Sequence, residues 1–434
     1  MPGRIDPAPR REVSAEGPQA RLGKTAKSVD QEARKKTASS QRALDFSHQR
    51  TAAKILPRER VGLCRWSVVS KAAGVDVVIN AYDREDGERD ERAAYVGLQT
   101  CGSVWLCPCC GRRISEKRRG ELNHLLAWAR SEGLWPVMLT LTARHRLGDE
   151  LAAQLDGMKR AKQRLRQRRE WRAIKGRIIG TVTATEVTHG AAAGWHTHFH
   201  EVALVRAGSE AEALALFAAM PRVWRSCLRG VGLDATLARG WQAQGAAAAG
   251  SYVTKWGAAE EIALGARKSA GEGGRTPRQL LAAAADGDAA AGRLWATYGR
   301  AFKGARQLVW SPGLKALAGV DEVDDVEAAK DARQGQEQRT VTNIAHQSWA
   351  KGARHHRAAI LDAAEDASDD MAAAAAVWAV IEASGEDQDS GAVIEDHPQE
   401  TPDRWTPPPM RSGGLAARAV AAIRSDTGVA PPLI

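Results

Sequence analysis

A run of alternating histidines near the middle of the chain constrains the fold more than any other stretch. His196, His198 and His200 are separated by single residues, and an apolar segment follows them directly. In a β-strand alternate side chains share one face, so a strand here would project the three imidazoles together. A second strand is predicted over 177–187, and the Gly- and Ala-rich turn between the two predicts an antiparallel hairpin.

The facing strand would supply a carboxylate to these histidines. Hairpin pairing would bring Glu186 beside His198 or His200. Two imidazoles and a carboxylate with open coordination positions are typical of a catalytic divalent cation that polarises a phosphate oxygen. Imidazoles favour softer cations than Mg²⁺, so Mn²⁺ is expected to serve at least as well. The predicted ligands are His198, His200 and Glu186, with His196 as a further candidate; the alternatives are solvated surface histidines and an exposed Glu186.

Four of the six cysteines fall within ten residues, which predicts a second metal site. Cys107 and Cys110 have the Cys-x-x-Cys spacing, Cys101 would add a third thiol, and Cys64 is the best available fourth. Closely spaced thiols around a Pro turn can enclose a tetrahedral Zn²⁺, and four thiolates leave no open coordination position. The predicted zinc is therefore structural. The alternative is a set of buried free cysteines.

One of the four tyrosines stands out by its neighbour. Tyr252 lies one turn before Lys255 on a predicted helix, so the two residues would share a helix face. Phosphoryl transfer through a covalent intermediate needs a side-chain nucleophile, and a nearby ammonium would stabilise the phenolate. Tyr252 is therefore a candidate nucleophile; core packing is the alternative.

Charge along the chain is uneven. The formal net charge is +10, and basic residues concentrate in the first sixty positions and again over 112–177, a segment that includes Arg164 and Arg168. The segment 362–403 is acidic instead. This distribution favours a nucleic-acid partner over a surface that is merely basic. No stretch resembles a signal peptide or a membrane span, so we expect a cytoplasmic protein with reduced cysteines.

Taken in order, five motifs resemble one known family. The segments 101–110, 139–142, 186–188, 196–200 and 252–255 together resemble the rolling-circle replication initiators of bacterial plasmids, the plasmid replication-protein branch of the HUH endonucleases. The resemblance implies an α+β fold whose central antiparallel sheet, flanked by helices, displays the His-hydrophobic-His pair. It also implies an upstream Cys-rich zinc-binding element and disordered termini.

The resemblance assigns roles to individual residues. Tyr252 matches the nicking tyrosine and Lys255 the lysine that follows it, while Glu186 stands where a third metal ligand is expected. Thr140 and Thr142 match the first motif, on the strand beside the metal strand, and are expected to contact DNA; Arg164 and Arg168 are expected to contact it as well, because they belong to the basic segment. Ala248 departs from the pattern, because some relatives carry at that position a glutamate thought to activate water at termination.

The resemblance also implies an activity. The protein would bind a double-stranded origin, nick a single-stranded site in it through a 5′-phosphotyrosine link, and leave a 3′-OH for a host polymerase. No Walker-type loop is present in the sequence, so a host helicase is expected. The alternatives are a related HUH transposase or relaxase and a non-catalytic zinc-containing DNA-binding regulator. Relaxases often place the tyrosine before the histidines, and Tyr252 follows them.

Composition divides the chain into four predicted parts. These are a disordered basic arm (1–55), a Cys-rich zinc-binding element with a helix (60–133), an HUH endonuclease domain (134–320) and an Ala-rich acidic, largely disordered tail (321–434). The other predicted elements are strands over 75–82, 94–98 and 135–142, and helices over 114–130, 149–172, 209–228 and 242–261 and from Thr276 onward.

Overall fold

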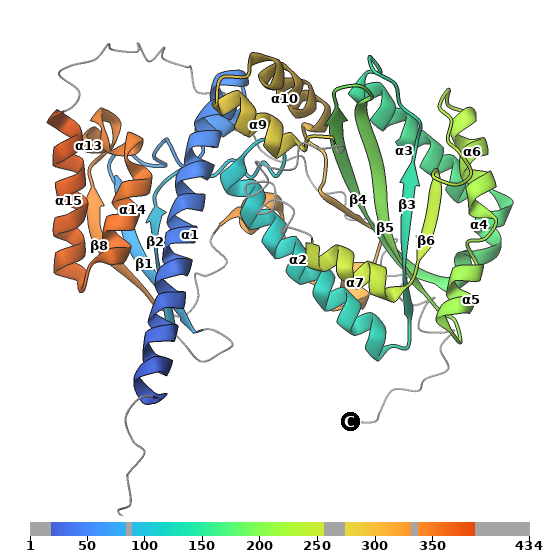
Figure 1. Cartoon of the computed structure of the whole chain (residues 1–434), viewed down its shortest axis with the longest axis horizontal. Helices are drawn as coiled ribbons and strands as arrows, with labels where there is room; N and C mark the ends of the chain where they lie inside the picture. The colour runs from blue at the N-terminus through green and yellow to red at the C-terminus, as the bar shows by residue number, and fades with distance from the viewer. Residues whose placement is uncertain (1–18, 84–88, 256–273, 331–336, 387–434) are drawn as a thin grey trace, which may run out of the picture.

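The computed structural model describes residues 19–83, 89–255, 274–330 and 337–386, which form two antiparallel sheets with helices packed around them (Figure 1). The strands are β1 (Val75–Asp83), β2 (Arg89–Val96), β3 (Trp135–Thr142), β4 (Ile178–Gly190), β5 (Gly194–Val205), β6 (Trp241–Gln244), β7 (Leu308–Trp310) and β8 (Glu337–Ile344). The larger sheet has the order β6-β3-β5-β4-β7, and the smaller one has the order β2-β1-β8. The predicted α+β class, with antiparallel sheets flanked by helices, is confirmed.

The predicted hairpin is confirmed as the centre of the larger sheet. β4 and β5 pair antiparallel with Glu186 opposite His198, and β3 pairs with the other edge of β5 and places Thr140 opposite His200. Gly194 begins β5 with φ +77°, in the left-handed region. A Cβ there would come within 2.9 Å of a carbonyl oxygen of the neighbouring loop, so only glycine fits this corner.

Helices cover both faces of the larger sheet (Figure 1). They are α2 (Pro108–Ser131), α3 (Leu151–Gln167), α4 (Arg169–Ile174), α5 (Glu210–Ala215), α6 (Met220–Arg229) and α7 (Ala246–Lys255). Val202 and Leu204 of β5 belong to the apolar cluster that α2 and α7 cover, whereas Phe199 and Ala203 belong to the cluster beneath α3 and α6. Burial of each large apolar side chain contributes roughly 1.5–3 kcal/mol. Since side chains alternate along β5, the three histidines lie on the face covered by α2 and α7, which we call the histidine face.

Three predicted helices differ from the structure. The helix predicted over 149–172 is divided into α3 and α4, because Arg168 has extended backbone between them. The helix predicted over 209–228 is likewise two helices, α5 and α6. The one predicted over 242–261 begins as β6, because Trp241 and its neighbours pair with the edge of β3, and α7 follows; its last six residues lie outside the described residues.

The remaining elements within the described residues are all helices. They are α1 (Gln19–Ile55), η1 (Arg60–Gly62), η2 (Lys175–Arg177), α9 (Pro277–Ala285), α10 (Ala289–Phe302), α11 (Leu314–Leu317), α12 (Asp325–Ala329), α13 (His346–Lys351), η3 (Ala353–His355), α14 (Arg357–Asp366) and α15 (Asp370–Glu386). The helix start predicted at Thr276 is confirmed by a capping box with Gln279. None of the helices within the described ranges has both the length and the apolar composition that a membrane crossing requires.

Both ends of the chain contribute to the fold, which corrects the predicted disorder. α1 occupies most of the predicted arm, and its second half is packed into the molecule, with Ala52 fully buried. β8 pairs with β1, so part of the predicted tail completes a sheet that begins in the predicted Cys-rich element. The alanine-rich composition hid this part of the core, whose large side chains are widely spaced: Trp349, Ile360 and Val377. The prediction for residues 1–18 and 387–434 lies outside the described residues.

A buried arginine holds the two ends together. Arg357, at the start of α14, donates hydrogen bonds to the carbonyl oxygens of Arg65 (2.6 Å) and Phe46 (3.1 Å). Its guanidinium also lies over the rings of Phe46 and Trp66, 4.4 and 4.9 Å from their centroids. Burial lowers the pKa of Arg357 to about 10, which still leaves it charged at neutral pH. α14 is thereby fixed to α1 and to the segment that directly follows Cys64.

Candidate metal centres

The two central strands bring three predicted ligands together on the histidine face. Glu186 Oε2 lies 3.1 Å from His198 Nε2 and 3.3 Å from His200 Nε2. One ligand atom from each of these residues lies within 4.8 Å of the other two. All three side chains are half-buried, so they remain accessible to a ligand. A group of two imidazoles and one carboxylate in this arrangement could bind a divalent cation while leaving coordination positions open.

A threonine on the neighbouring strand orients one of these histidines. Thr140 Oγ1 lies 3.2 Å from His200 Nδ1, so the hydroxyl can accept a hydrogen bond from Nδ1–H and fix the ring with Nε2 toward Glu186. His198 Nδ1 is buried and has no hydrogen-bond partner within the described part of the chain. The motif match predicts a DNA contact for Thr140. The hydrogen bond between Thr140 and His200 is a separate finding, which depends on the register of the two strands.

The hydroxyl of Thr140 is therefore expected to matter for metal affinity. In Thr140→Val the shape of the side chain is kept, but His200 loses its orienting partner. We expect Mn²⁺ affinity, measured by calorimetry, to fall roughly 10- to 100-fold. Thr142→Val is the matched control, because Thr142 lies opposite His198 on the same strand without a side-chain hydrogen bond to it among the described residues. Equal affinities in the two variants would contradict this role.

The protonation state of the site also suits a cation. Burial raises the pKa of the Glu186 carboxyl, but hydrogen bonds from His198 and His200 outweigh burial and hold this pKa well below its usual range. Glu186 is therefore ionised at neutral pH. Burial, together with the nearby His198 and His145, lowers the pKa of His196 to about 4, so His196 is neutral.

His196 lies beside the ligand group rather than inside it. Its ring centroid is 5.2 Å from that of His198, but His196 is not among the residues whose ligand atoms converge. On its other side the ring of His145 lies 4.7 Å away. Sequence reasoning missed His145. Its position in the sequence could have indicated it, because His145 comes three residues after Thr142, the strand residue that lies opposite His198.

The four predicted zinc ligands also come together. Cys110 Sγ lies 3.4 Å from Cys64 Sγ and 3.7 Å from Cys101 Sγ, and with Cys107 all four sulfurs lie within 4.8 Å of one another. A tetrahedral zinc with bonds of about 2.3 Å would separate its sulfurs by roughly 3.8 Å, which is close to these distances. The cluster could therefore bind a metal.

The two other cysteines have different surroundings. Cys109 is not one of the four cysteines whose sulfurs converge, and its Sγ lies 3.6 Å from the carbonyl oxygen of Asp45. Cys227 is buried in the separate core under α6. All six cysteines are unpaired. Hydrogen bonds from the neighbouring thiols lower the pKa of Cys110 well below its usual range, whereas burial raises the pKa of Cys107. A bound cation would complete the deprotonation of the cluster.

The other predicted site residues fall in two places. Tyr252 and Lys255 belong to α7, but their side chains lie outside the described part of the structure. Arg164 and Arg168 are exposed on α3 and at its end, on the side of the sheet opposite the histidine face. The structure therefore does not bring these two arginines to the candidate catalytic metal.

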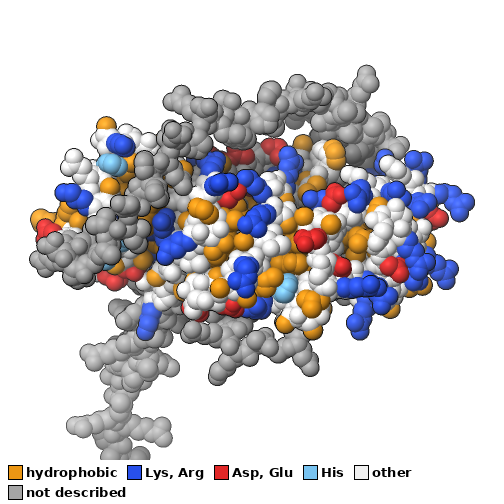
Figure 2. All heavy atoms as spheres, turned by 90° about the horizontal axis from the view of Figure 1, so that it is seen from above, with side chains coloured by type: hydrophobic (Ala, Val, Ile, Leu, Met, Phe, Trp, Pro, Cys, Tyr) orange, Lys and Arg blue, Asp and Glu red, His pale blue; other side chains and the backbone are white. Residues whose placement is uncertain are grey.

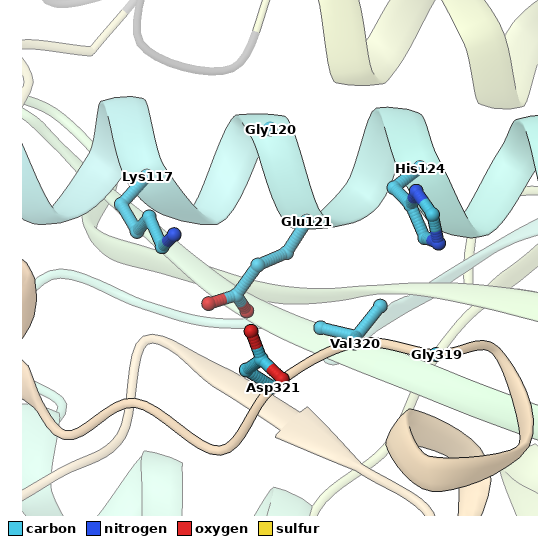
Figure 3. A pocket seen from close by; sticks show the side chains of 7 residues that line it. All are labelled: Lys117, Gly120, Glu121, His124, Gly319, Val320 and Asp321. Atoms are coloured by element: carbon cyan, nitrogen blue, oxygen red, sulfur yellow. The ribbon is translucent and has the colours of Figure 1, made fainter. Parts of the chain in front are cut away.

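A pocket of about 180 Å³ lies between α2 and residues 319–321 (Figure 3). Its carboxylate Glu121 pairs with Arg118 (2.6 Å) and Lys315 (3.3 Å). Lys315 also donates to the carbonyl oxygen of Asp321 (3.2 Å). None of the predicted site residues lines this pocket. These contacts fasten the loop to α2, so we assign the pocket a structural role.

The fold and these two groups define a protein with two candidate metal centres, one of them accessible on an antiparallel sheet. Residues 97–217 match the family model described as Replication protein, and this span contains both strands of the Glu186–His198–His200 group. The resemblance to plasmid replication proteins that the motifs predict is thereby confirmed.

The chain is also similar to two known proteins, one of which is named as a replication protein. The chain is 29% identical over 333 residues to the protein named Protein rep of Streptomyces lividans, a match that covers 58% of this chain and 72% of the relative. It is 34% identical over 146 residues to a protein of Streptomyces cyanogenus named Neomycin resistance protein. That match covers 28% of this chain and only 33% of the relative. No solved structure matches the chain.

Proposed function

We propose that this protein starts rolling-circle replication of a bacterial plasmid by nicking one strand of the origin. The larger sheet would be an HUH-type nuclease sheet within residues 134–320, and residues 60–133 would form its zinc-binding element. One observation carries the proposal. The Glu186–His198–His200 group lies on the sheet face covered by α7, the helix that contains Tyr252. The replication-protein match supports the same assignment, although Tyr252 lies beyond the matched span.

The reaction would be a transfer of the phosphodiester to tyrosine. A divalent cation held by Glu186, His198 and His200 would polarise an oxygen of the scissile phosphate. Tyr252 loses its phenolic proton and its oxygen bonds to phosphorus, while the bond from phosphorus to the 3′ oxygen breaks and that oxygen gains a proton. Lys255 stabilises the phenolate and the developing negative charge. The 5′-phosphotyrosine keeps the phosphodiester energy, so rejoining needs no nucleotide triphosphate.

The setting of this reaction would be the bacterial cytoplasm. Plasmid origin DNA is the substrate, and a host polymerase extends the free 3′-OH while a host helicase unwinds the duplex. A related HUH transposase or relaxase would use the same chemistry. The position of Tyr252 after the histidines favours the initiator over a relaxase. A regulator that binds DNA without catalysis is the candidate from another class, with the histidines holding a structural metal.

A nicking assay tests the proposal. With Mn²⁺ or Mg²⁺ the protein should cut a labelled single-stranded oligonucleotide that carries the origin of its own replicon. His198→Ala should slow cleavage by at least about 100-fold, since it removes several kcal/mol of transition-state stabilisation. His346→Ala, in α13 by the smaller sheet, is the control and should cut at the wild-type rate. Duplex binding without any cleavage would favour the regulator instead.

A further inference from the structure

We infer that the outer surface of α3, α4 and α6 is a contact surface for double-stranded DNA, separate from the histidine face. The inference rests on the proposed function, because it adds a duplex site to the proposed single-strand nuclease. We call it the α3–α6 basic surface. Its exposed members are Lys159, Arg160, Arg164, Arg168, Arg172 and Arg222.

The first step concerns charge. Residues 151–177 contain ten Lys and Arg but only two acids, Asp156 and Glu170. Two of the ten basic residues turn inward: Lys162 Nζ lies 2.6 Å from Glu201 Oε2, and Arg166 pairs with the same carboxylate. The other basic residues of this segment lie at the surface, where they contact solvent or other surface polar groups.

Glu201 fixes this inward pair from beneath the metal strand. Glu201 directly follows His200 in β5, and its side chain is fully buried. Burial raises the pKa of Glu201, but the charges of Lys162 and Arg166 outweigh burial and bring this pKa to about 2. Breaking such a pair would leave a buried charge without compensation. Lys162 and Arg166 are therefore structural, and they attach α3 to the strand that holds the candidate metal.

The outward residues are poorly neutralised. Lys159, Arg164 and Arg172 have no acidic partner within 4.0 Å among the described residues, and all three are exposed. Arg160 pairs with Asp156 in solvent, an arrangement that contributes little to stability. Like charges crowded on one face repel each other, and a polyanion bound there would relieve that repulsion.

α6 extends the same surface. Arg168 donates to Ser226 Oγ (3.4 Å), and the guanidinium of Arg164 lies so close to Gly230 that a Cβ there would be 2.4 Å from Nη1. Arg222 is exposed on the same helix. Figure 2 shows Lys and Arg side chains gathered at the end of the molecule where α4 and α6 lie in Figure 1. The basic residues of α3, α4 and α6 therefore form one surface.

The surface fits a duplex better than a single strand. Single-strand sites stack bases on exposed aromatic rings. Both tryptophans of this region, Trp171 and Trp224, are buried in the core. From Lys159 to the end of α3 at Gln167 the helical rise gives a row of roughly 12 Å, the length of about three to four base pairs, and Arg168 and Arg172 follow beyond this helix. A row of cations without stacking partners is suited to phosphates, which position a duplex without reading its sequence.

The two DNA contacts would lie on opposite sides of the sheet. The histidine face is covered by α2 and α7, while α3 and α6 cover the other face. A strand at the metal group therefore cannot touch the α3–α6 basic surface without passing around an edge of the sheet. Origin recognition and cleavage would thus be separable functions of one domain.

A charge-removal variant tests the inference. In the full chain, Lys159, Arg164, Arg168 and Arg172 are all changed to Gln. Binding to an origin duplex and cleavage of a single-stranded nick oligonucleotide are then measured from 50 to 200 mM salt. If each residue neutralises one phosphate, the slope of log K against log salt falls in magnitude by about 3.6. Over that range wild-type affinity should then decline roughly 100-fold more than that of the variant.

A control removes the same charge elsewhere. Lys71, Arg130, Arg300 and Arg306 are exposed outside this surface, and their change to Gln should leave the salt slope at the wild-type value. The inference is supported if only the first variant loses duplex binding while single-strand cleavage stays within twofold of wild type. It is overturned if both variants bind the duplex alike, or if single-strand cleavage falls as far as duplex binding. Absence of cleavage in the wild type would instead reject the proposed function, and the comparison of duplex binding between the two variants would still test the surface.

Discussion

Tyr252→Phe is expected to abolish the covalent protein–DNA adduct while leaving oligonucleotide binding intact. The substitution removes only the phenolic oxygen, which would form the bond to phosphorus, and keeps the ring. Loss of a nucleophile lowers the rate by at least about 10⁴-fold in enzymes that depend on one, so the adduct should fall below detection. The measurement is a denaturing gel of protein incubated with Mn²⁺ and an origin oligonucleotide labelled on the 3′ side of the nick.

Tyr298→Phe is the matched control for this experiment. Tyr298 is 4% exposed, and its ring packs against Phe302 at a centroid distance of 4.8 Å in the core beside the cysteines. The same hydroxyl is removed there without loss of the packed ring, and the adduct should form as in the wild type. An adduct that persists in Tyr252→Phe would show that another residue is the nucleophile, and peptide mass spectrometry of the adduct would identify it.

The Glu186–His198–His200 group could be predicted because its geometry follows from local rules. A period of two fixes which histidines share a face, and a tight hairpin fixes which residue of the preceding strand lies opposite. The pairing of Glu186 with His198 is thus a short-range consequence of the sequence. The same holds for Cys107 and Cys110, which lie at the first turns of one helix. Cys64 is more distant in sequence, and its selection rested on the need for a fourth thiol.

Other features depend on long-range pairing that no local pattern encodes. The contact from Thr140 to His200 requires β3 to lie beside β5 in one particular register. The role of β8 requires a partner strand more than 250 residues away, and its polar, alternating sequence resembles a surface segment. α1 lacks apolar periodicity, and ion pairs help to fix it: Asp45 of this helix binds both Arg112 and Arg278. A helix held by ion pairs has the same charged composition as a disordered segment, so composition alone predicts disorder for it.

Cys110→Ser is expected to release metal from the four-thiol cluster and to destabilise the surrounding fold. Cys110 is 1% exposed, and its sulfur lies 3.4 Å from that of Cys64 and 3.7 Å from that of Cys101. Structural zinc contributes roughly 10–16 kcal/mol in small zinc domains, which is comparable to the net stability of a whole domain, about 5–15 kcal/mol. Zinc content by mass spectrometry should fall to near zero. Thermal unfolding should move down by roughly 10 °C or more.

Cys109→Ser separates metal binding from packing, because the two positions are adjacent and both are buried. Its hydroxyl can donate to the Asp45 carbonyl oxygen as the thiol does, so zinc content and Tm should stay close to wild type. A chelator should lower the Tm of the wild type and of Cys109→Ser but should not lower that of Cys110→Ser further. Similar losses of stability in both variants, with no zinc in the wild type, would instead mean that the four thiols are ordinary core residues. The region that joins α1, α2 and α14 would then be held by Arg357, by the ion pairs of Asp45 and Arg42, and by its apolar core.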